Sequence, residues 1–481
     1  MKVPKFLVSY AFICLMIGCG GAGDRASIQR GSGDVSADIS TLAPTDANTD
    51  ADINADADAD GGVLIDEMPI VADAPLCDDT DGDNICDDVD LCFGDNTLGD
   101  PDRDGLCGET AACSDTPADE AVSMYLFRRP LTINHQQVGM DNTGNLPASG
   151  FPVLVTLQGD WLHTSTTDPQ NGKTASEFGY DIVFTASDGI TLLAHDLEEY
   201  NAASGTLTAW VRIDSLSKAT DTTLYMYYGN PCLTSPTENQ AAVWDSGYKG
   251  VWHLNEDPGA AGVEGIKDAT ANNHNGTPFG GLSNADSVTG IAGKSIVFSQ
   301  RDCYINFGDV DDFDFGLGNF SVSGWIKGNQ VWTALTTKSN DLGPYNGLYI
   351  YTSKIHNNWT WWGSRVNDDE YAQFDPSSMD GNWHHLAVVR EGTGANQFKI
   401  YTDGVLTRTT LEDTNLSNDK DFMIHRWHDE YAIAGTLIDE VRVSNTARSY
   451  DWIRTSYNNQ SNPGAIGSPG FYTVGAEESL N

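Results

Sequence analysis

Short apolar or alternating runs recur from Tyr125 onward, and the first of them end at Gly, Asn, Asp or Pro. The clearest are residues 152–157, 207–213, 223–228, 295–298, 320–325, 385–389 and 398–401. Many short runs at this spacing are typical of β-sandwiches and jelly rolls. A short helical period competes with them only at residues 448–457. The sequence therefore predicts an all-β fold with two tandem β-sandwich or jelly-roll domains.

The region before these domains is strongly acidic. The chain has a formal net charge of −43, and residues 34–120 contain 26 Asp and Glu residues but one basic residue, Arg103. That segment carries −25 and leaves −18 for the other residues, a balance that argues against nucleic acid and favours metal cations. Residues 19–76 are rich in Ala and Asp and offer little apolar surface, so we expect a disordered tether.

The first residues are typical of an export signal. Lys2 and Lys5 precede an apolar stretch, residues 6–17, that is too short to span a bilayer. The stretch ends at Cys19 in a motif that resembles a bacterial lipobox, with Met16 where Leu is usual. The resemblance implies a signal peptide over residues 1–18, lipid on Cys19 and membrane attachment; Gly20 in place of Asp favours the outer membrane or cell surface. The alternative is a signal peptide without lipid and a chance cysteine.

Residues 77–113 contain five cysteines interleaved with aspartates, and five positions recur at an offset of 21 residues. Carboxylates at loop positions 1, 3 and 5 with a carbonyl at position 7 can surround calcium. The first loop would use Asp79, Asp81, Asp83, the carbonyl of Ile85, and Asp90; the second, degraded loop keeps Asp100, Asp102 and Asp104. Outside Cys14 and Cys19 seven cysteines remain, so at least one is free or intermolecular.

This repeat resembles a thrombospondin type 3 repeat, which implies a calcium-binding stalk over residues 77–120. Two alternatives are a plain acidic tether and a dockerin or EF-hand loop. The second needs a helix after the loop, where this sequence has cysteines and glycines.

Residues 124–250 are similar to a bacterial β-sandwich family of unknown function. The similarity rests on residues 128–133, 181–184, 188–189, 225–231, 243–245 and 251–256. Residues 251–475 resemble a laminin-G-like, concanavalin A-like jelly roll, on residues 268–270, 273–277, 304–307, 320–325, 383–388, 401–404 and 438–443. This second resemblance implies a binding module for glycan or protein, often with structural calcium.

The first and last strands of such folds lie near each other, so Asp268 and Asp439 are candidates to share a calcium ion. The alternative makes Asp268 a turn residue and Asp439 the partner of an arginine at a strand edge. Trp361, Trp362 and Trp427 are candidate sugar-stacking residues, and the alternative places them in the core.

No catalytic constellation is recognisable in the sequence. Glu198 and Glu199 are adjacent, so we expect them on opposite faces of a strand, unlike the paired carboxylates of glycosidases. We expect a non-enzymatic, lipid-anchored surface protein that binds an extracellular glycan or protein and has calcium as its cofactor. The alternatives are a glycan hydrolase with an unrecognised site in the jelly roll, and a purely structural envelope protein.

Overall fold

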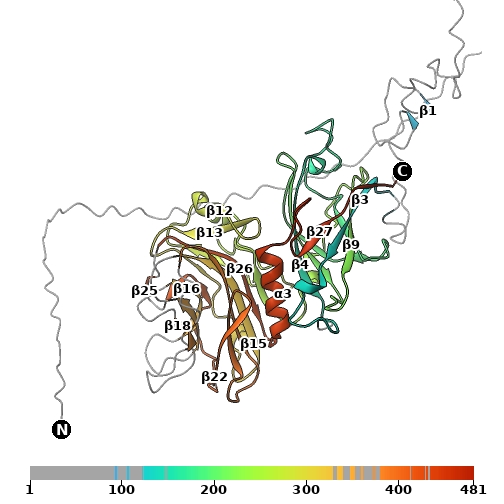
Figure 1. The fold of residues 1–481 in the computed structure, drawn as a ribbon. Coiled ribbons are helices and arrows are strands. Elements are labelled where there is room, and N and C mark those ends of the chain that lie inside the picture. The colour runs from blue at the N-terminus through green and yellow to red at the C-terminus, as the bar shows by residue number, and fades with distance from the viewer. Residues whose placement is uncertain are drawn as a thin grey trace, which may run out of the picture. The chain divides into compact units, whose positions relative to one another are not determined.

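The computed structural model describes residues 93–94, 106–107, 122, 124–146, 149–328, 333–339, 347–352, 359–360, 372–373, 380–411, 413–427, 430–431 and 434–480. These residues are mostly strands and loops (Figure 1), which confirms the predicted all-β fold. Residues Leu76–Asn481 form one compact unit, and two β-sandwiches account for most of it.

The first sandwich packs a six-stranded sheet against a three-stranded sheet. The larger sheet has the order β27-β3-β9-β5-β6, and β28 also pairs with β3. Its strands are β3 (Phe127–Ile133), β5 (Val183–Thr185), β6 (Leu192–Leu193), β9 (Thr222–Tyr228), β27 (Tyr472–Val474) and β28 (Glu478–Ser479). The smaller sheet has the order β4-β8-β7, with β4 (Phe151–Gln158), β7 (His195–Asn201) and β8 (Thr206–Ile213). Alternate apolar residues of both sheets fill the core between them.

The end of the chain returns to the first sandwich. Thr473 of β27 pairs with Thr132 of β3, and Glu478 of β28 pairs with Arg128. The predicted second domain, residues 251–475, includes residues 472–474, which the structure pairs with β3 of the first sandwich. Short strands carry no local signal for which edge they will join.

The second sandwich packs an eight-stranded sheet against a five-stranded one. The large sheet has the order β12-β13-β26-β15-β20-β21-β22, with β10 also paired to β26. Its strands are β10 (Tyr248–Trp252), β12 (Ser287–Thr289), β13 (Lys294–Phe298), β15 (Phe320–Lys327), β20 (Trp383–Arg390), β21 (Phe398–Thr402), β22 (Val405–Thr410) and β26 (Thr436–Ser444). The smaller sheet, β11-β14-β23-β16-β17, uses β11 (Thr277–Phe279), β14 (Tyr304–Asn306), β16 (Thr333–Ser339), β17 (Gly347–Thr352) and β23 (Met423–Ile424).

Helices are few and short in the described part of the chain. The longest, α3 (Tyr450–Ser461), begins at Ser449, whose side chain accepts a hydrogen bond from the amide of Trp452; it covers most of the predicted helical period. The other helices are α1 (Gln240–Val243), α2 (Pro258–Ala261), η2 (His135–Gln137), η3 (Asp160–Leu162), η4 (Asn284–Asp286) and η5 (Asp311–Phe313). Three small strand pairs are β1 (Phe93–Gly94) with β2 (Leu106–Cys107), β18 (Trp359–Thr360) with β19 (Ala372–Gln373), and β24 (Arg426–Trp427) with β25 (Glu430–Tyr431).

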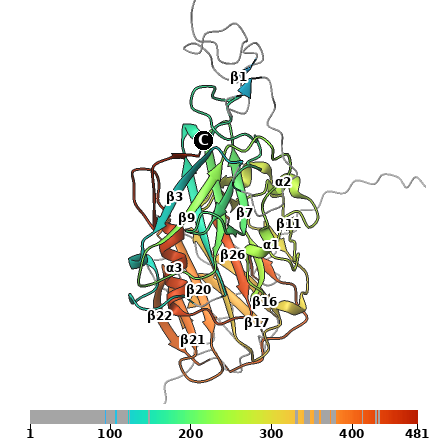
Figure 2. The ribbon, with the colours of Figure 1, turned by 90° about the vertical axis from the view of Figure 1, so that its right-hand side faces the viewer.

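Both faces of the eight-stranded sheet are buried. In β20, Leu386 and Val388 join the core of the second sandwich, whereas Ala387 and Val389 join the core that continues into the first. Helix α3 contributes to that second layer, where the ring of Trp452 lies 4.9 Å from the ring of Phe151 in β4. Figure 2 shows the strands of both sandwiches in one body. The two sandwiches therefore share a buried layer, and the site described next lies in it.

Candidate functional site

Most of the functional residues predicted from the sequence lie outside the described residues. They are Cys19, the repeat residues Asp79, Asp81, Asp83, Ile85, Asp90, Asp100, Asp102 and Asp104, and the tryptophans Trp361 and Trp362. Trp427 ends β24, where only the backbone is described. The proposed lipid, calcium loops and tryptophan rim therefore stay predictions.

Asp268 organises a turn beside β10. One of its carboxylate oxygens, Oδ1, accepts hydrogen bonds from the amides of Val251 and Thr270 at 3.0 and 2.9 Å. The other, Oδ2, accepts from the Thr270 hydroxyl and the His274 amide, both at 2.9 Å. Four protein donors therefore occupy this carboxylate, as the turn-residue interpretation expects. The shared calcium site stays a prediction.

Asp439 lies in β26, at the centre of the large sheet. Its Oδ2 accepts hydrogen bonds from the amides of Ile291 and Ala292, at 2.6 and 3.3 Å. The alternative interpretation of Asp439, as the partner of an arginine at a strand edge, is wrong, because Arg442 pairs with the next residue, Glu440, at 2.8 Å. β26 has neighbours on both sides, so Asp439 is not at an edge.

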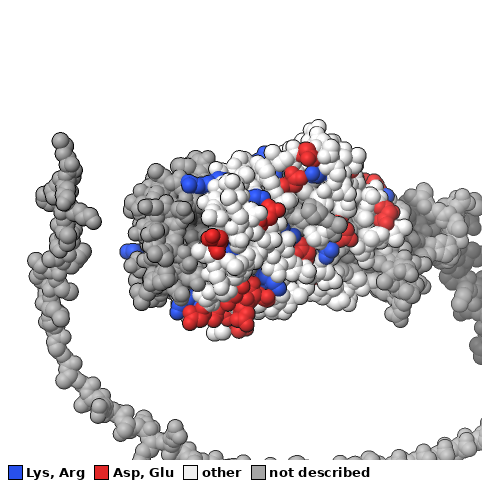
Figure 3. All heavy atoms as spheres, turned by 90° about the horizontal axis from the view of Figure 1, so that it is seen from below, with Lys and Arg blue, Asp and Glu red and all other residues white. Residues whose placement is uncertain are grey.

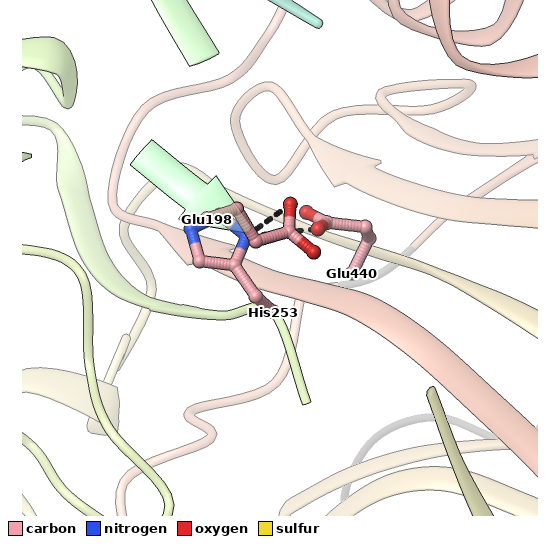
Figure 4. A group of neighbouring side chains, drawn as sticks. All are labelled: Glu198, His253 and Glu440. Carbon is pink, nitrogen blue, oxygen red and sulfur yellow. Dashed lines mark hydrogen bonds and ion pairs between the residues drawn. The ribbon is translucent and has the colours of Figure 1, made fainter. Parts of the chain in front are cut away.

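The described residues bring together a different group, which we name the interface cluster: Asp196, Glu198, His253, Glu440 and Arg442. Asp196 and Glu198 come from β7 of the first sandwich; His253 follows β10; Glu440 and Arg442 come from β26. Figure 4 shows that the side chains of Glu198, His253 and Glu440 converge. Because the five residues come from both sandwiches, the cluster forms only when the two are packed together.

The imidazole of His253 is the centre of the cluster. Its Nδ1 lies 2.8 Å from Glu440 Oε1 and 3.6 Å from Glu198 Oε2, and its Nε2 lies 3.1 Å from Asp196 Oδ2. The ring is parallel to that of Trp210, at 6.0 Å and 16°. One imidazole thus connects acidic side chains of both sandwiches.

Tryptophan, glutamine and arginine side chains hold the carboxylates from outside. Trp210 Nε1 donates a hydrogen bond to Glu198 Oε2 at 2.9 Å. Asp196 accepts two hydrogen bonds, from Trp244 Nε1 to Oδ2 at 3.2 Å and from Gln240 Nε2 to Oδ1 at 3.1 Å. The Arg442 guanidinium donates to Glu440 Oε2 and lies 4.1 Å above the Trp210 ring. These contacts fix the orientation of each acid.

A β-bulge places Glu440 in the cluster. The pairing of β26 with β15 shifts at Gly324, so two residues of β26, Glu440 and Val441, occupy the space of one. Glu440 has φ +52°, a left-handed conformation that is strained for a residue with a side chain. The bulge lets Ile438 and Val441 both enter the core while Glu440 and Arg442 face the first sandwich.

Burial perturbs the acids and the histidine in different directions. Burial raises the pKa of Glu198 to about 8, against the lowering effect of His253. Burial also raises the pKa of Asp439 well above its usual range, and Glu440 and Glu198 add to this. For Glu440 the raising effect of burial is outweighed by His253 and Arg442, which lower its pKa. Burial would lower the pKa of His253, but Glu440, Glu198 and Asp196 raise it well above its usual value.

The charges do not balance within the protein. With Asp439, four carboxyl groups face two cationic side chains, Arg442 and His253. Glu198 and Asp439 are the carboxyl groups left over, and each has one buried oxygen, Oε1 and Oδ1, without a hydrogen-bond partner in the described part of the chain. An unpaired buried carboxylate is costly unless it keeps a proton or meets a cation.

A pocket of about 340 Å³ opens beside the cluster. Its walls are Phe178, Gly179, Tyr180, His195, Leu197, Glu198, Glu199, Tyr200, Pro236, Thr237 and Glu238. The Phe178 side chain is 61% exposed, and its ring lies 5.4 Å from that of Tyr180 in a stacked arrangement. The pocket therefore combines an aromatic surface with carboxylates.

The expectation that Glu198 and Glu199 point to opposite faces is wrong. A Cβ placed on Gly293 would lie 2.8 Å from Glu198 Oε1 and 3.2 Å from Glu199 Oε2, so both carboxylates approach the same point. The cause is a second register shift, between Asp196 and Glu199 in the pairing of β7 with β8. A bulge breaks the alternation on which the expectation rested.

Acidic side chains gather in one patch on the face of the molecule seen in Figure 3, with basic side chains near it.

Cys303 is buried and free, and its thiol donates to the carbonyl of Gly280 at 3.2 Å; an odd number of cysteines requires at least one such residue. Among the described helices, none is both long and apolar enough to cross a membrane.

Sequence reasoning missed the interface cluster as a unit. The sequence of residues 438–443 does contain one sign of the bulge, because its apolar residues stand at positions 438, 441 and 443. Apolar residues on one face of a regular strand are two positions apart, so a step of three indicates an inserted residue. His253, the partner of Glu440 at the centre of the cluster, lies 187 residues earlier in the chain, so no local pattern connects the two.

Two protein-family models match parts of the chain. Residues 299–454 match the concanavalin A-like lectin/glucanases superfamily, and residues 179–252 match a domain of unknown function, DUF2341. No curated protein matches the chain significantly.

Among solved structures, one similar to this chain is the binding domain of Paraclostridial Mosquitocidal Protein 1, at 15% identity and TM-score 0.33, over 44% of this chain and 52% of that one. Another is domain 4 of AbnA, an extracellular arabinanase from Geobacillus stearothermophilus, in complex with arabinotriose, at 20% identity and TM-score 0.29, over 44% and 97%. The binding domain of botulinum neurotoxin serotype C1 gives 14% identity and TM-score 0.33, over 46% and 53%. This chain thus spans about half the length of the toxin chains. At these TM-scores the likeness carries no conclusion about function.

The second sandwich thus contains a region, residues 299–454, that is similar to the concanavalin A-like lectin/glucanases superfamily.

Proposed function

We propose that this protein is a lipid-anchored surface protein of the bacterial envelope that binds an extracellular glycan without turning it over. The observation that carries the glycan is the pocket beside β7, where an exposed phenylalanine ring stacks on a tyrosine next to carboxylates. The lipobox at Cys19 supports the anchor, and the Asp-rich repeat supports a stalk ordered by calcium.

The chemistry of the pocket suits a sugar better than an apolar ligand. A sugar ring presents C–H groups on its faces and hydroxyl groups around its edge. Phe178 offers a flat apolar surface for such a face, and the carboxylates of Glu199 and Glu238 can accept hydrogen bonds from hydroxyl groups. Glu238 is already oriented, because its Oε2 accepts a hydrogen bond from the amide of Leu197 at 2.8 Å.

The similarity of residues 299–454 to a lectin and glucanase superfamily supports a carbohydrate ligand as well. That similarity concerns the second sandwich, whereas the pocket lies in the first. A fold alone does not establish a ligand, so the pocket is the part of the proposal that an experiment should address first.

The test is a glycan array probed with the full chain, followed by affinity measurements on any glycan that binds. Phe178→Ala should weaken binding about tenfold or more, as expected when an aromatic anchor is removed. The melting temperature should not change, because the ring is 61% exposed. Ile190→Ala is the matched control: Ile190 is 67% exposed in the same sandwich and does not line the pocket. Equal affinities of the two variants and wild type would remove this pocket from the proposal.

A glycan hydrolase is the second candidate, favoured by the approach of Glu198 and Glu199 at one wall of the pocket. Against it, the Glu198 side chain has no exposed surface, so a substrate could not reach it without movement. The bound glycan should therefore be incubated with the protein and analysed for new reducing ends. Release of sugar that Glu199→Gln abolishes would replace the binding-only proposal with the enzyme.

A further inference from the structure

We propose that Glu198, His253 and Glu440 form a binding site for a divalent transition-metal ion of the zinc class, buried between the two sandwiches. One ligand atom from each residue lies within 4.8 Å of the other two. All three side chains are buried, and Figure 4 shows them pointing toward a common centre.

The donor set selects the class of metal. Imidazole nitrogen and carboxylate oxygen are ordinary zinc ligands, and three protein ligands leave a fourth place for water or another oxygen. Calcium instead takes six or more oxygen ligands. A nitrogen donor therefore favours zinc or a related transition metal.

The groups around the ligands are those that a metal site needs. The second nitrogen of His253, Nε2, is held by Asp196, as metal-binding imidazoles usually are by a carboxylate. Arg442 holds one oxygen of Glu440 and leaves the other, Oε1, on the side of His253. Trp210 donates to Glu198 Oε2, the oxygen that lies 3.6 Å from His253 Nδ1. All three ligands are thus oriented by residues outside the centre.

The unpaired oxygen of Glu198 is an independent sign of a missing cation. Glu198 is fully buried, and its Oε1 has no hydrogen-bond partner in the described part of the chain. Asp439 Oδ1 has none either. When His253 is a neutral metal ligand, the four carboxyl groups face Arg442 alone, and a doubly charged ion would offset two of the three excess negative charges. The competing explanation is an ion-free network in which Glu198 keeps its proton.

Glu198→Gln separates the two explanations. The full chain is produced with zinc in the medium, so that a buried site can fill as the protein folds, and is then dialysed against calcium to occupy the stalk. Zinc is counted by mass spectrometry. Wild type should hold one more zinc equivalent than Glu198→Gln, and Glu199→Gln should hold as much as wild type. The last variant removes the neighbouring carboxylate, which is not one of the three ligands.

Cobalt distinguishes this site from the cysteines of the stalk. The difference spectrum between cobalt-loaded wild type and Glu198→Gln should show the ligand-field bands of a nitrogen–oxygen site and no thiolate charge-transfer band. A thiolate band in that difference, or equal metal content in wild type and Glu198→Gln, overturns the proposal.

A second variant keeps the test valid if Glu198→Gln does not fold. Asp196→Asn leaves all three ligands in place and should weaken zinc binding about 10- to 100-fold through the loss of the carboxylate behind His253. Folding of each variant is checked by near-ultraviolet circular dichroism. If the folded Asp196→Asn protein loses no more zinc than wild type does on mild chelation, a site built on His253 is contradicted.

Discussion

The two faces of the eight-stranded sheet are built from the same strands but filled in different ways. Trp252 ends β10 and His253 follows it; the first enters the core of the second sandwich, and the second enters the interface cluster. The first face is lined mainly by apolar side chains, whereas the other gathers four carboxyl groups, an imidazole and a guanidinium. Apolar packing specifies the first face through shape, and the second depends on each charge finding its partner.

Removing Trp252 should have the largest effect. Its ring lies 4.3 Å from that of Phe307 and 5.6 Å from that of Phe422, and its Nε1 donates to the carbonyl of His274 at 2.8 Å. Trp252→Ala leaves a cavity and an unpaired carbonyl, which should lower the free energy of unfolding by about 3–5 kcal/mol. Urea denaturation measures this; a loss below about 1 kcal/mol would mean that this face is not the tightly packed one.

Glu440→Ala should have a slightly smaller effect, because it leaves charge unpaired instead of space unfilled. His253 Nδ1 and the Arg442 guanidinium both lose the carboxylate oxygen that they contact, and breaking a buried ion pair from one side costs about 3 kcal/mol. Glu440→Gln keeps the shape and an acceptor oxygen and should lose less, by the same urea measurement. If the Ala and Gln variants were equally stable, charge pairing would not be what holds this face together.

The smallest effect is expected at another histidine of the same sheet, His384 in β20. His384 Nδ1 lies 2.8 Å from Asp403 Oδ2, and its Nε2 lies 3.1 Å from Asp380 Oδ1. The bond with Asp403 raises the pKa of His384, against the effect of burial, and the bond with Asp380 adds to the rise. The folded protein therefore holds this proton more tightly than the unfolded chain does.

The stabilisation from His384 is fully present below the unfolded pKa of about 6.5 and is lost as pH rises through the higher folded pKa. The stability difference between wild type and His384→Gln should thus be largest near pH 6, stay under about 1 kcal/mol, and shrink at alkaline pH. Denaturant titrations at several pH values measure it. A difference that does not vary with pH would contradict a protonated His384.

The sequence predicts the apolar face well and the charged face poorly, for a physical reason. Residues 385–389 form a short apolar run that indicates a strand, and the structure has β20 there. The cluster instead depends on two bulges and on the packing of two sandwiches. Neither follows from period-two alternation, which a bulge interrupts, nor from spacing along the chain.

The C-terminal strands were missed for a related reason. Residues 472–474 and 478–479 are too short to show a period, and their partner, β3, stands more than 300 residues earlier. Only the closed fold brings them together.

This last pairing has a mechanical consequence. β3 is hydrogen-bonded to β9 along its whole length on one side and to β27 and β28 on the other. Tension that reaches the sandwich from the N-terminal side enters at Phe127 and pulls along the axis of β3. The hydrogen bonds on both sides then carry the load together in shear, and none can open alone as in a zipper. The last residues of the chain thus brace its first long strand against force.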